Sequence, residues 1–533
     1  MIATHAPDRG AWRSPALAWA AGLLVAFFAG GLRLLHFTQI PRFTDETDVV
    51  VRALAISRGE ILPLTDTDGY IGAGFSYVLA TILALFGPDP FLPRAVVIMA
   101  GVLTVGAAFL LGRELAGLTP DAEAKPNRGG AFAVGLLAAL LLAVSPVHIL
   151  VNSRIAWSHA TTPLFTTLGI WLLARAVRRS DGASLAWSGL LFGIALQSHP
   201  TAIALAPGAA AWLVWRGRWL LRTRWAAAAL GLGAVGCSTL LAYNLLTGFD
   251  SVREALAKSD AYALERAGRA PYTLALRLEL EGLVRVLAGA IGEGRGDLAP
   301  LARPGAIAWA ILTPLALAWT VRAGVWLPLV VVAPFLLILP MLNSKYEPLL
   351  NGRYLMPIVP LVQSAVALLA VAVWRRAAGA SRWAMVAVGL IVVLVLFDQR
   401  RSLTAYENAA LADGGNLPYV DAAMRIRQLH QPGDLILLDA DLGGARVASN
   451  REGVSVLEYL LVVHPEPLPV ASGGANELAE QIEQGSGRQL LALLPDTRQE
   501  LAARYRLTPV GEPPAGREQR LRNLGLYRVD GRR

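Results

Sequence analysis

Long apolar blocks fill most of the sequence between residues 16 and 397, and this feature constrains the fold more than any other. A helix that crosses a bilayer needs about 20 mostly apolar residues. Only 16% of the residues are charged, against roughly 25% in soluble domains, and the mean hydropathy is +0.48. The sequence therefore predicts a mainly α, polytopic transmembrane helix bundle of about eleven spans with additional juxtamembrane helices. The predicted spans are 16–35, 92–111, 130–150, 158–177, 184–199, 200–215, 225–246, 304–321, 325–342, 354–374 and 383–397.

Basic residues cluster in the short links between these blocks, which is the pattern that orients a membrane protein. Placing all the clusters in the cytoplasm requires that 71–87, a shorter Gly-rich apolar run, lies at the outer interface instead of crossing. The N-terminus is then cytoplasmic and the C-terminal region extracytoplasmic, in a multi-pass protein of the inner (plasma) membrane. In the alternative topology, 71–87 crosses and a weak segment such as 383–397 does not. The basic clusters lie at 113–128, 175–179, 216–224, 322 and 375–382.

Several functional classes are excluded. The net charge is +9, but no Lys/Arg stripe interleaved with aromatic residues occurs, so we expect no nucleic-acid partner. Neither a P-loop nor a dinucleotide-binding glycine motif is present, so nucleotide chemistry on the inner face is unsupported. Cys237 is the only cysteine, which excludes an intramolecular disulfide and a cysteine-based metal site.

The last part of the chain has the amino-acid composition of a soluble protein. We divide the sequence into a transmembrane domain, residues 1–400, and a small extracytoplasmic α/β domain, residues 401–533, because apolar strand-like and helix-like segments alternate there. We expect this domain to recognise a substrate or a partner. The predicted strands are 434–439 (DLILLD), 454–463 and 489–494, and the predicted helices are 476–483 and 497–505.

Three carboxylates lie directly after the first predicted span, in Asp45, Glu46 and Asp48. Carboxylates beside a bilayer are costly unless they are paired or functional. Repulsion and partial burial would raise the pKa of one of them, which suits a general base. The alternative is a helix start, in which Thr44 or Asp45 caps a helix over 49–56 and the acids favour its dipole.

Other polar residues fall on the same predicted side. Arg154 and His159 stand between two spans and can face a phosphate or a sugar, although they can also extend to the lipid headgroups. His199 precedes Pro200 in a break that proline alone would explain. Asp66 and Asp68 flank a turn, where capping is the expected role.

Lys345 and Arg353 lie on the outer side, where orientation does not need positive charge. A guanidinium there can hold a lipid phosphate through two oxygens at once, and the alternative is again contact with headgroups. Carboxylates, an arginine and a lysine on one face are the groups that a general base and an anion-binding site require.

These residues resemble the GT-C superfamily of integral membrane glycosyltransferases, and in particular the group of dolichyl-phosphate-mannose protein mannosyltransferases and lipid A aminoarabinose transferases. The resemblance covers roughly the first 400 residues. The features that carry it are the Asp45–Glu46 pair, FLPRAVVIMAGVLTVGAAFLLGREL around Arg94, SPVHILVNSRIAWSHATTPLF, the His199–Pro200–Thr201 junction and Arg353-Tyr354-Leu355-Met356-Pro357.

The resemblance implies transfer of a sugar from a polyprenyl-phosphate donor to a hydroxyl on the outer face, with inversion at the anomeric carbon. By analogy Asp45 would be the base, supported by Glu46. Arg353 would hold the leaving phosphate, with Lys345 and Arg94 as further candidates. Family members carry an acidic residue near the position of His159, so its absence predicts metal-independent transfer without a cofactor. The predicted substrate-binding residues are Arg154, His159, His199 and Tyr354.

Two other functions stay open. A transporter or flippase would move a lipid-linked sugar without bond chemistry, but the paired interrupted helices of such proteins are not evident. A non-catalytic assembly protein would dock a partner through the α/β domain. The sequence does not name the sugar, and the acceptor can be a protein, a lipid or a glycan.

Overall fold

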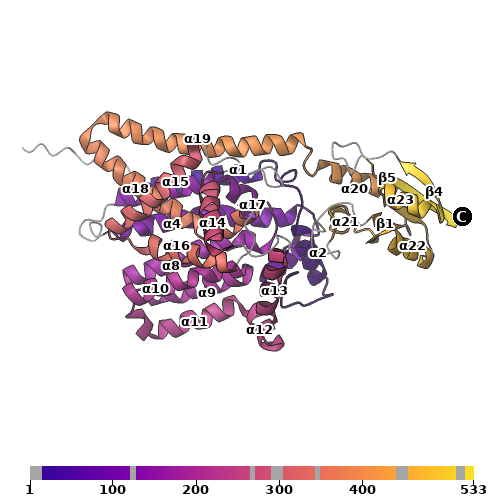
Figure 1. Cartoon of the computed structure of the whole chain (residues 1–533), viewed down its shortest axis with the longest axis horizontal. Helices are drawn as coiled ribbons and strands as arrows, with labels where there is room; N and C mark the ends of the chain where they lie inside the picture. The colour runs from indigo at the N-terminus through magenta and orange to yellow at the C-terminus, as the bar shows by residue number, and fades with distance from the viewer. Residues whose placement is uncertain are drawn as a thin grey trace, which may run out of the picture.

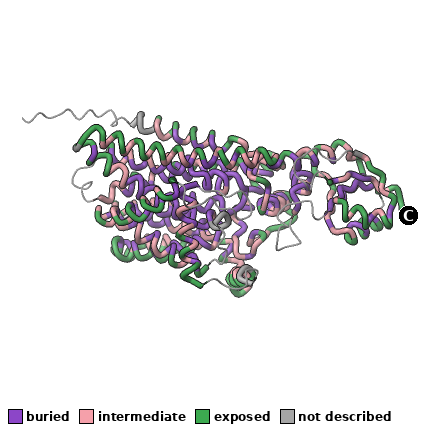
Figure 2. Tube along the Cα trace, turned by 45° about the horizontal axis from the view of Figure 1, so that its top comes forward, coloured by how far each residue is buried: buried purple, intermediate pink, exposed green. Residues whose placement is uncertain are grey.

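The computed structural model describes residues 15–119, 128–264, 271–289, 304–342, 348–439, 454–485, 487–511 and 523–532. A helical bundle forms the larger part of the molecule, and a small α/β unit lies at one end of it (Figure 1). Buried residues concentrate along the interior of the bundle (Figure 2). The predicted mainly helical fold with a small sheet is therefore present, whereas the predicted division into domains stays a prediction.

The first half of the bundle contains long helices joined by short ones. In chain order these are α1 (Pro15–Leu34), α2 (Glu46–Ser57), α3 (Gly74–Phe86), α4 (Leu92–Gly117), α6 (Arg128–Ala143), α7 (Pro146–Leu150), η2 (Ser158–Thr161), α8 (Thr162–Arg179), α9 (Gly182–Ser198), η3 (Pro200–Leu205), α10 (Ala206–Arg216) and η4 (Leu220–Arg222). The second half continues with α11 (Arg224–Gly236), α12 (Ser238–Thr247), α13 (Asp250–Leu264), α14 (Tyr272–Leu287), α15 (Pro304–Arg322), α16 (Leu327–Leu342), α17 (Pro348–Leu355), α18 (Val359–Ala380) and α19 (Arg382–Ala412).

The helix ends follow local chemistry. Helix α9 is capped at its start by Asp181, whose carboxylate accepts from the Ser184 N–H, and it ends before the His199–Pro200 pair. Proline lacks an N–H and clashes with a preceding helical turn, so the chain continues in η3 at a new angle. Helix α19 is likewise capped by Ser381, whose hydroxyl accepts from the Ala384 N–H.

The number of spans is smaller than predicted when helices are judged by length and composition. Five described helices are long and apolar enough to cross a membrane, and a bent pair would make a sixth, so the predicted eleven is not confirmed. The bent pair is the predicted span 225–246, which breaks between α11 and α12 with a bend of 77°. Helix α3 has 13 residues, about 20 Å, which is shorter than the hydrocarbon core. The run 71–87 thus forms a short helix, and its interfacial placement stays a prediction.

Helix α19 is long and stands along one flank of the bundle, from its far end to the α/β unit (Figure 1). Its described buried residues are Gln399, Ser402, Leu403 and Glu407, all in its second half. The first half exposes large apolar side chains, as a lipid-facing helix does. The predicted domain boundary at residue 400 lies inside this helix.

The α/β unit contains a five-stranded sheet with the order β2-β1-β3-β5-β4, in which β2, β1 and β3 are parallel and β5 and β4 are antiparallel. The strands at 434–439 and 489–494 and the helix at 476–483 are confirmed, and the helix predicted at 497–505 is shorter. The strand predicted at 454–463 is wrong, because most of that segment is helix α21. The elements are α20 (Leu417–Leu429), β1 (Leu435–Asp439), α21 (Val456–Val462), β2 (Val470–Gly473), α22 (Ala475–Gln484), β3 (Gln489–Leu493), α23 (Pro495–Ala502), β4 (Tyr505–Gly511) and β5 (Gly525–Arg532).

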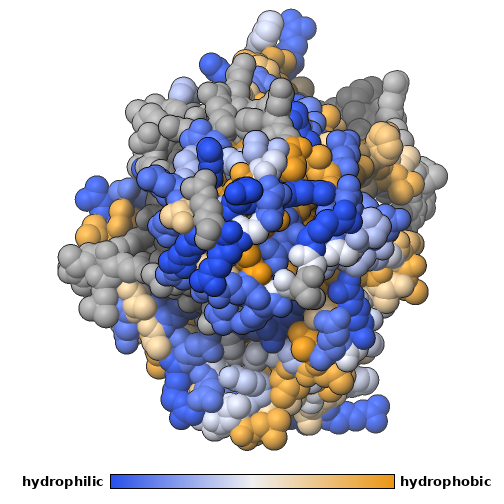
Figure 3. Space-filling model, turned by 90° about the vertical axis from the view of Figure 1, so that its right-hand side faces the viewer, coloured by the Kyte–Doolittle hydropathy of each residue, from blue (hydrophilic) through white to orange (hydrophobic). Residues whose placement is uncertain are grey.

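The α/β unit shares a hydrophobic core with the end of the bundle. Buried residues of α2 and α3, such as Val50 and Leu79, form one cluster with α21 residues such as Leu457 and strand residues such as Ile436. Seen from the end that carries this unit, the surface is mainly hydrophilic (Figure 3). The α/β unit is therefore packed directly on the segment that follows α1, where the three carboxylates lie.

Candidate functional site

Asp45 and Arg353 meet at the end of the bundle, although 308 positions separate them in the sequence. Nη1 of Arg353 lies 3.6 Å from Oδ2 of Asp45, and their side chains are 11% and 57% exposed. Asp45 occupies the N-cap position of α2, but its side chain makes no capping hydrogen bond. The predicted helix does begin here, with Glu46 and Asp48 in its first turn, but the Asp45 side chain does not cap it. Its carboxylate is largely exposed and lies beside a guanidinium.

The guanidinium of Arg353 is held between aromatic rings. Its central carbon lies 4.5 Å from the ring centre of Trp157 and 4.9 Å from that of Tyr354, and Nη2 donates to the Tyr354 hydroxyl at 2.8 Å. Burial alone lowers the pKa of Arg353, but attraction to Tyr354 and Asp45 outweighs it and raises the pKa above the ordinary value. Arg353 is therefore a fixed, permanently charged group.

Two histidines form the wall beside this arginine. The rings of His159 and His199 stack at 3.9 Å, and each lies about 5 Å from the Tyr354 ring, at 5.3 and 5.2 Å. Nδ1 of His199 lies 2.9 Å from the hydroxyl of Thr201, and the same Nδ1 accepts from the Thr201 N–H. Among the described residues, neither ring nitrogen of His159 has a hydrogen-bond partner. The structure thus brings His159, His199 and Tyr354 together with Arg353.

Glu46 and Arg94 form a separate buried pair behind Asp45. Both side chains are at most 1% exposed, and Arg94 bonds both carboxylate oxygens of Glu46. The remaining Nη1 of Arg94 donates to the carbonyls of Phe37 and Pro41, and Glu46 also accepts from the Ala156 N–H. Arg94 therefore has little capacity left for a phosphate, and we assign this pair a positioning role in place of direct contact with the substrate.

Arg154 also lies away from the cluster. Its fully buried side chain donates to the main-chain carbonyls of Arg33 and Leu32 in α1 and forms an ion pair of 3.0 Å with Glu407 of α19. The substrate contact predicted for Arg154 does not fit this burial. The residue instead ties the segment that carries Trp157 to two helices.

Removing the carboxylate of Glu407 is expected to destabilise the protein. The Glu407→Ala variant leaves Arg154 buried without its partner, and breaking such a pair costs about 3–5 kcal/mol. We expect a markedly lower Tm for purified protein in detergent. Glu60→Ala, which breaks an exposed pair with Arg58, should change Tm little. Equal Tm values for the two variants would contradict this role.

Lys345 lies outside the described residues, so its predicted phosphate contact stays a prediction. Among the described residues, no three His, Cys, Asp or Glu side chains gather as a metal site requires. Transfer without a metal likewise stays a prediction.

The chain is similar to a protein family over one segment and to solved structures over nearly its whole length. Residues 128–243, which include both histidine segments, match the family described as Dolichyl-phosphate-mannose-protein mannosyltransferase. No curated protein matches the chain. The structure of ArnT from Cupriavidus metallidurans is similar over nearly its whole length, with a TM-score of 0.56, 14% identity, and coverage of 96% of this chain and 97% of ArnT. The same values hold for ArnT bound to undecaprenyl phosphate and for its apo state.

The chain has a GT-C fold. The predicted resemblance to this superfamily is thereby confirmed, and at 14% identity the likeness to ArnT concerns the fold. Arabinosyltransferase EmbB from Mycobacterium smegmatis is less similar, with a TM-score of 0.38, 16% identity, and coverage of 70% of this chain and 31% of EmbB.

Sequence reasoning missed two residues at the edge of the Arg353 cluster. Trp157 lies under Arg353, and Tyr70 stands edge-on to His199, with ring centres 6.5 Å apart. Trp157 stands two positions before His159 in the block that carried the resemblance, which was a usable signal. Nothing in the sequence linked Tyr70 to a histidine 129 positions later.

Tyr70 belongs to a hairpin that α13 holds over the site. The hairpin closes through a bridge between Thr65 and Gly72. Asp68 at its tip pairs with Lys258 of α13 and accepts from the Tyr70 hydroxyl at 2.8 Å. The segments that carry Tyr70, Trp157 and His199 thus converge on the Arg353 cluster.

The burial of Asp66 in this hairpin makes the stability of the protein depend on pH. It is 3% exposed, and burial raises its pKa to about 6, although bonds from the Thr67 N–H and the Ser76 hydroxyl and the charge of Arg52 offset part of the shift. A raised folded-state pKa means that the folded state holds the proton more tightly. Stability is therefore lost as pH rises from about 4 through 6, by about 3 kcal/mol in all.

The Asp66→Asn variant should lack this loss. We expect the Tm difference between variant and wild type to grow from pH 4 to pH 6 and to stay constant above pH 7. Asp250→Asn, at an exposed position on α13, should keep the wild-type slope. A difference that does not change with pH would show that Asp66 stays ionised.

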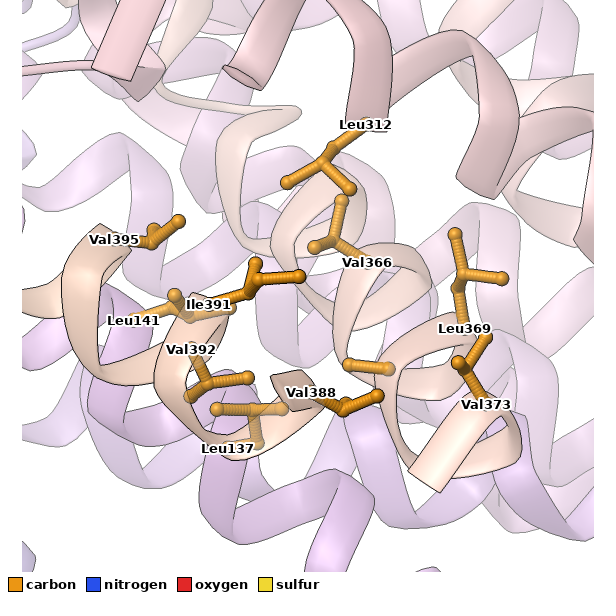
Figure 4. Close-up of a pocket in the computed structure, with 11 residues that line it drawn as sticks. Leu137, Leu141, Leu312, Val366, Leu369, Val373, Val388, Ile391, Val392 and Val395 are labelled. Atoms are coloured by element: carbon orange, nitrogen blue, oxygen red, sulfur yellow. The ribbon is translucent and has the colours of Figure 1, made fainter. Parts of the chain in front are cut away.

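An apolar cavity of about 140 Å³ lies elsewhere, between α6, α15, α18 and α19 (Figure 4). Aliphatic side chains such as Leu141, Leu312, Val366 and Ile391 line it, and it shares no lining residue with the Arg353 cluster. Such a lining can accommodate hydrocarbon but provides no group for catalysis. The polar cluster around Arg353 is therefore the stronger candidate for a catalytic site.

Proposed function

We propose that this protein is a membrane glycosyltransferase that moves a sugar from a polyprenyl-phosphate donor to a hydroxyl acceptor, with inversion. The contact of 3.6 Å between Asp45 and Arg353 is the observation that carries the proposal. It places a water-facing carboxylate and a fixed guanidinium at one point, as removing a proton and stabilising a phosphate require.

The reaction divides the work between these two residues. The acceptor oxygen bonds to the anomeric carbon while the bond from that carbon to the phosphate oxygen breaks. The electron pair leaves with the phosphate, whose charge Arg353 stabilises, and the hydroxyl proton goes to Asp45. Because the leaving group is already an anion, no acid is needed to protonate it.

The wall beside Arg353 supports a ligand with many oxygens. His159 Nδ1 and Nε2, Trp157 Nε1 and Arg353 Nε are buried without a partner among the described residues. A buried polar group without a partner costs about 1–3 kcal/mol, so sugar and phosphate oxygens that approach these nitrogens would recover part of that cost. The likeness to ArnT, solved with undecaprenyl phosphate, supports a polyprenyl phosphate as the lipid part of the donor.

The proposal includes an orientation. The site and the α/β unit face the extracytoplasmic side of the plasma membrane, the N-terminus is cytoplasmic, and the short basic links lie inside. The acceptor is a hydroxyl of a protein, a lipid or a glycan. A reporter enzyme that is active only outside the cytoplasm, fused after Arg533, should be active, and an inactive fusion would contradict this orientation.

The direct test uses the purified full chain and a panel of polyprenyl-phosphate sugars. We expect release of polyprenyl phosphate with at least one donor when an acceptor extract is present. If no donor yields lipid phosphate, while labelled lipid-linked sugar crosses the bilayer of reconstituted vesicles, the transporter hypothesis replaces this one.

A further inference from the structure

We propose that the α/β domain is a working part of the site, because it holds the segment 38–48 and thereby sets the position of Asp45. The inference rests on the proposed function and deepens it. It names Asn416 and Asp48 as positioning residues that act through the main chain around Asp45. Two groups of contacts, one on each side of Asp45, carry the argument.

The first group comes from the turn between α19 and α20. The Asn416 side chain is 1% exposed, and its Oδ1 accepts from the Phe43 N–H at 2.9 Å. Its Nδ2 donates to the carbonyls of Thr38 and Pro41, at 3.2 and 3.0 Å, and its main-chain N–H donates to the Gln39 carbonyl at 2.9 Å. One side chain thus uses both its acceptor and its amide donors to fix the turn that leads to Asp45.

The close approach at this turn depends on a glycine. Gly415 has a φ of +55°, and a Cβ at this position would lie 2.3 Å from the Gln39 carbonyl oxygen. Any side chain would strain the backbone and push the two segments apart. The contact between 413–416 and 38–43 therefore depends both on the glycine backbone at Gly415 and on the hydrogen bonds of Asn416.

The second group comes from the segment that enters α21. Oδ1 of Asp48 accepts from the Val454 N–H at 2.6 Å, and the Thr47 hydroxyl donates to the Val454 carbonyl at 3.1 Å. The ring of Tyr459 packs 5.1 Å from that of Phe43. The first turn of α2 is thus tied to the main chain of a residue more than 400 positions away.

Asp45 itself has few contacts that could hold it. Its carboxylate is 57% exposed, and among the described residues it pairs with Arg353 at 3.6 Å and accepts from the Thr44 hydroxyl at 3.3 Å. The main chain on either side must therefore fix it, and the α/β domain holds both sides. A displacement of about 1 Å in a reacting group can cost about 100-fold in rate. Docking of this domain consequently sets the transfer rate.

The test combines the transfer rate with hydrogen–deuterium exchange on the full-length protein. Asn416→Ala should lower kcat roughly 10- to 100-fold, leave the donor KM within about twofold because Arg353 is untouched, and raise exchange in peptides that cover 43–48. Asn476→Ala removes an exposed contact with Arg504 in the same domain and should change none of kcat, donor KM and exchange over 43–48.

A second pair of variants separates positioning from a loss of folding. Asp48→Ala should slow transfer, whereas Asp48→Asn, which keeps an acceptor oxygen for the Val454 N–H, should recover part of the rate at an equal Tm. Unchanged exchange over 43–48 in Asn416→Ala, or a KM that rises while kcat holds, would overturn the inference. If the wild type transfers no sugar, the proposed function fails by itself, and the exchange data still decide whether the domain holds the segment.

Discussion

The Asp45→Asn variant is expected to lose transfer by about 10²- to 10⁴-fold, the range that a general base contributes. The amide has the shape of the carboxylate but cannot accept the proton of the acceptor hydroxyl. Folding should be intact, because Asp45 is 57% exposed and makes no capping hydrogen bond. Release of polyprenyl phosphate from the donor, followed under single-turnover conditions, measures the effect.

A matched control for this variant exists on α13. Asp250 is an exposed carboxylate that also pairs with an arginine, Arg253, so Asp250→Asn removes an equivalent charge outside the site. It should transfer at the wild-type rate. Donor binding should persist in Asp45→Asn, because the phosphate clamp is unchanged. Full activity of Asp45→Asn would show that Asp45 is not the general base. A transporter or an assembly protein would then be favoured.

The sequence predicted those parts of the fold that depend on local pattern. Apolar blocks of 15–25 residues predicted the bundle, and the His199–Pro200 pair predicted the break between α9 and α10. The alternation of segments after residue 417 predicted an α/β unit. Asp45 and Arg353 lie 3.6 Å apart, although no local signal links them, and the side of the membrane on which they lie stays a prediction.

The errors have physical causes that particular residues illustrate. The run 454–463 is rich in β-branched residues and was interpreted as a strand, but a short apolar run does not distinguish a strand from a buried helix. A start signal for the helix was present, because the Ser455 hydroxyl accepts from the Glu458 N–H at the first turn of α21. The sequence predicts that Arg94 binds phosphate, and only the fold reveals that its guanidinium is already paired with Glu46.

The difference between Arg94 and Arg353 shows what sequence reasoning lacked. Both are arginines beside predicted outer segments, and both resemble anion clamps. Arg94 has a buried carboxylate partner that bonds it twice, so its charge is already neutralised. Arg353 has a partner at 3.6 Å that is largely in water, and aromatic faces fix its orientation. Burial and partner geometry, which the sequence does not encode locally, decide which arginine can accept a phosphate.

Replacing Arg353 is therefore expected to have the second large effect. Arg353→Gln removes the charge that stabilises the leaving phosphate, and the loss of one such group costs about 10²- to 10³-fold in kcat. Arg353→Lys keeps the charge but loses the two-pronged contact and the stacking on Trp157, so we expect an intermediate loss. Arg253→Gln, the exposed arginine of the control pair, should be neutral.

Product inhibition separates phosphate binding from a general disturbance of the site. Added polyprenyl phosphate should inhibit the wild type and Asp45→Asn alike but should inhibit Arg353→Gln far less, because only that variant lacks the clamp. The double variant should be little worse than either single one, since base and clamp serve the same bond exchange. Losses that multiply in the double variant, together with unchanged inhibition by lipid phosphate in Arg353→Gln, would show that Arg353 does not hold the leaving group.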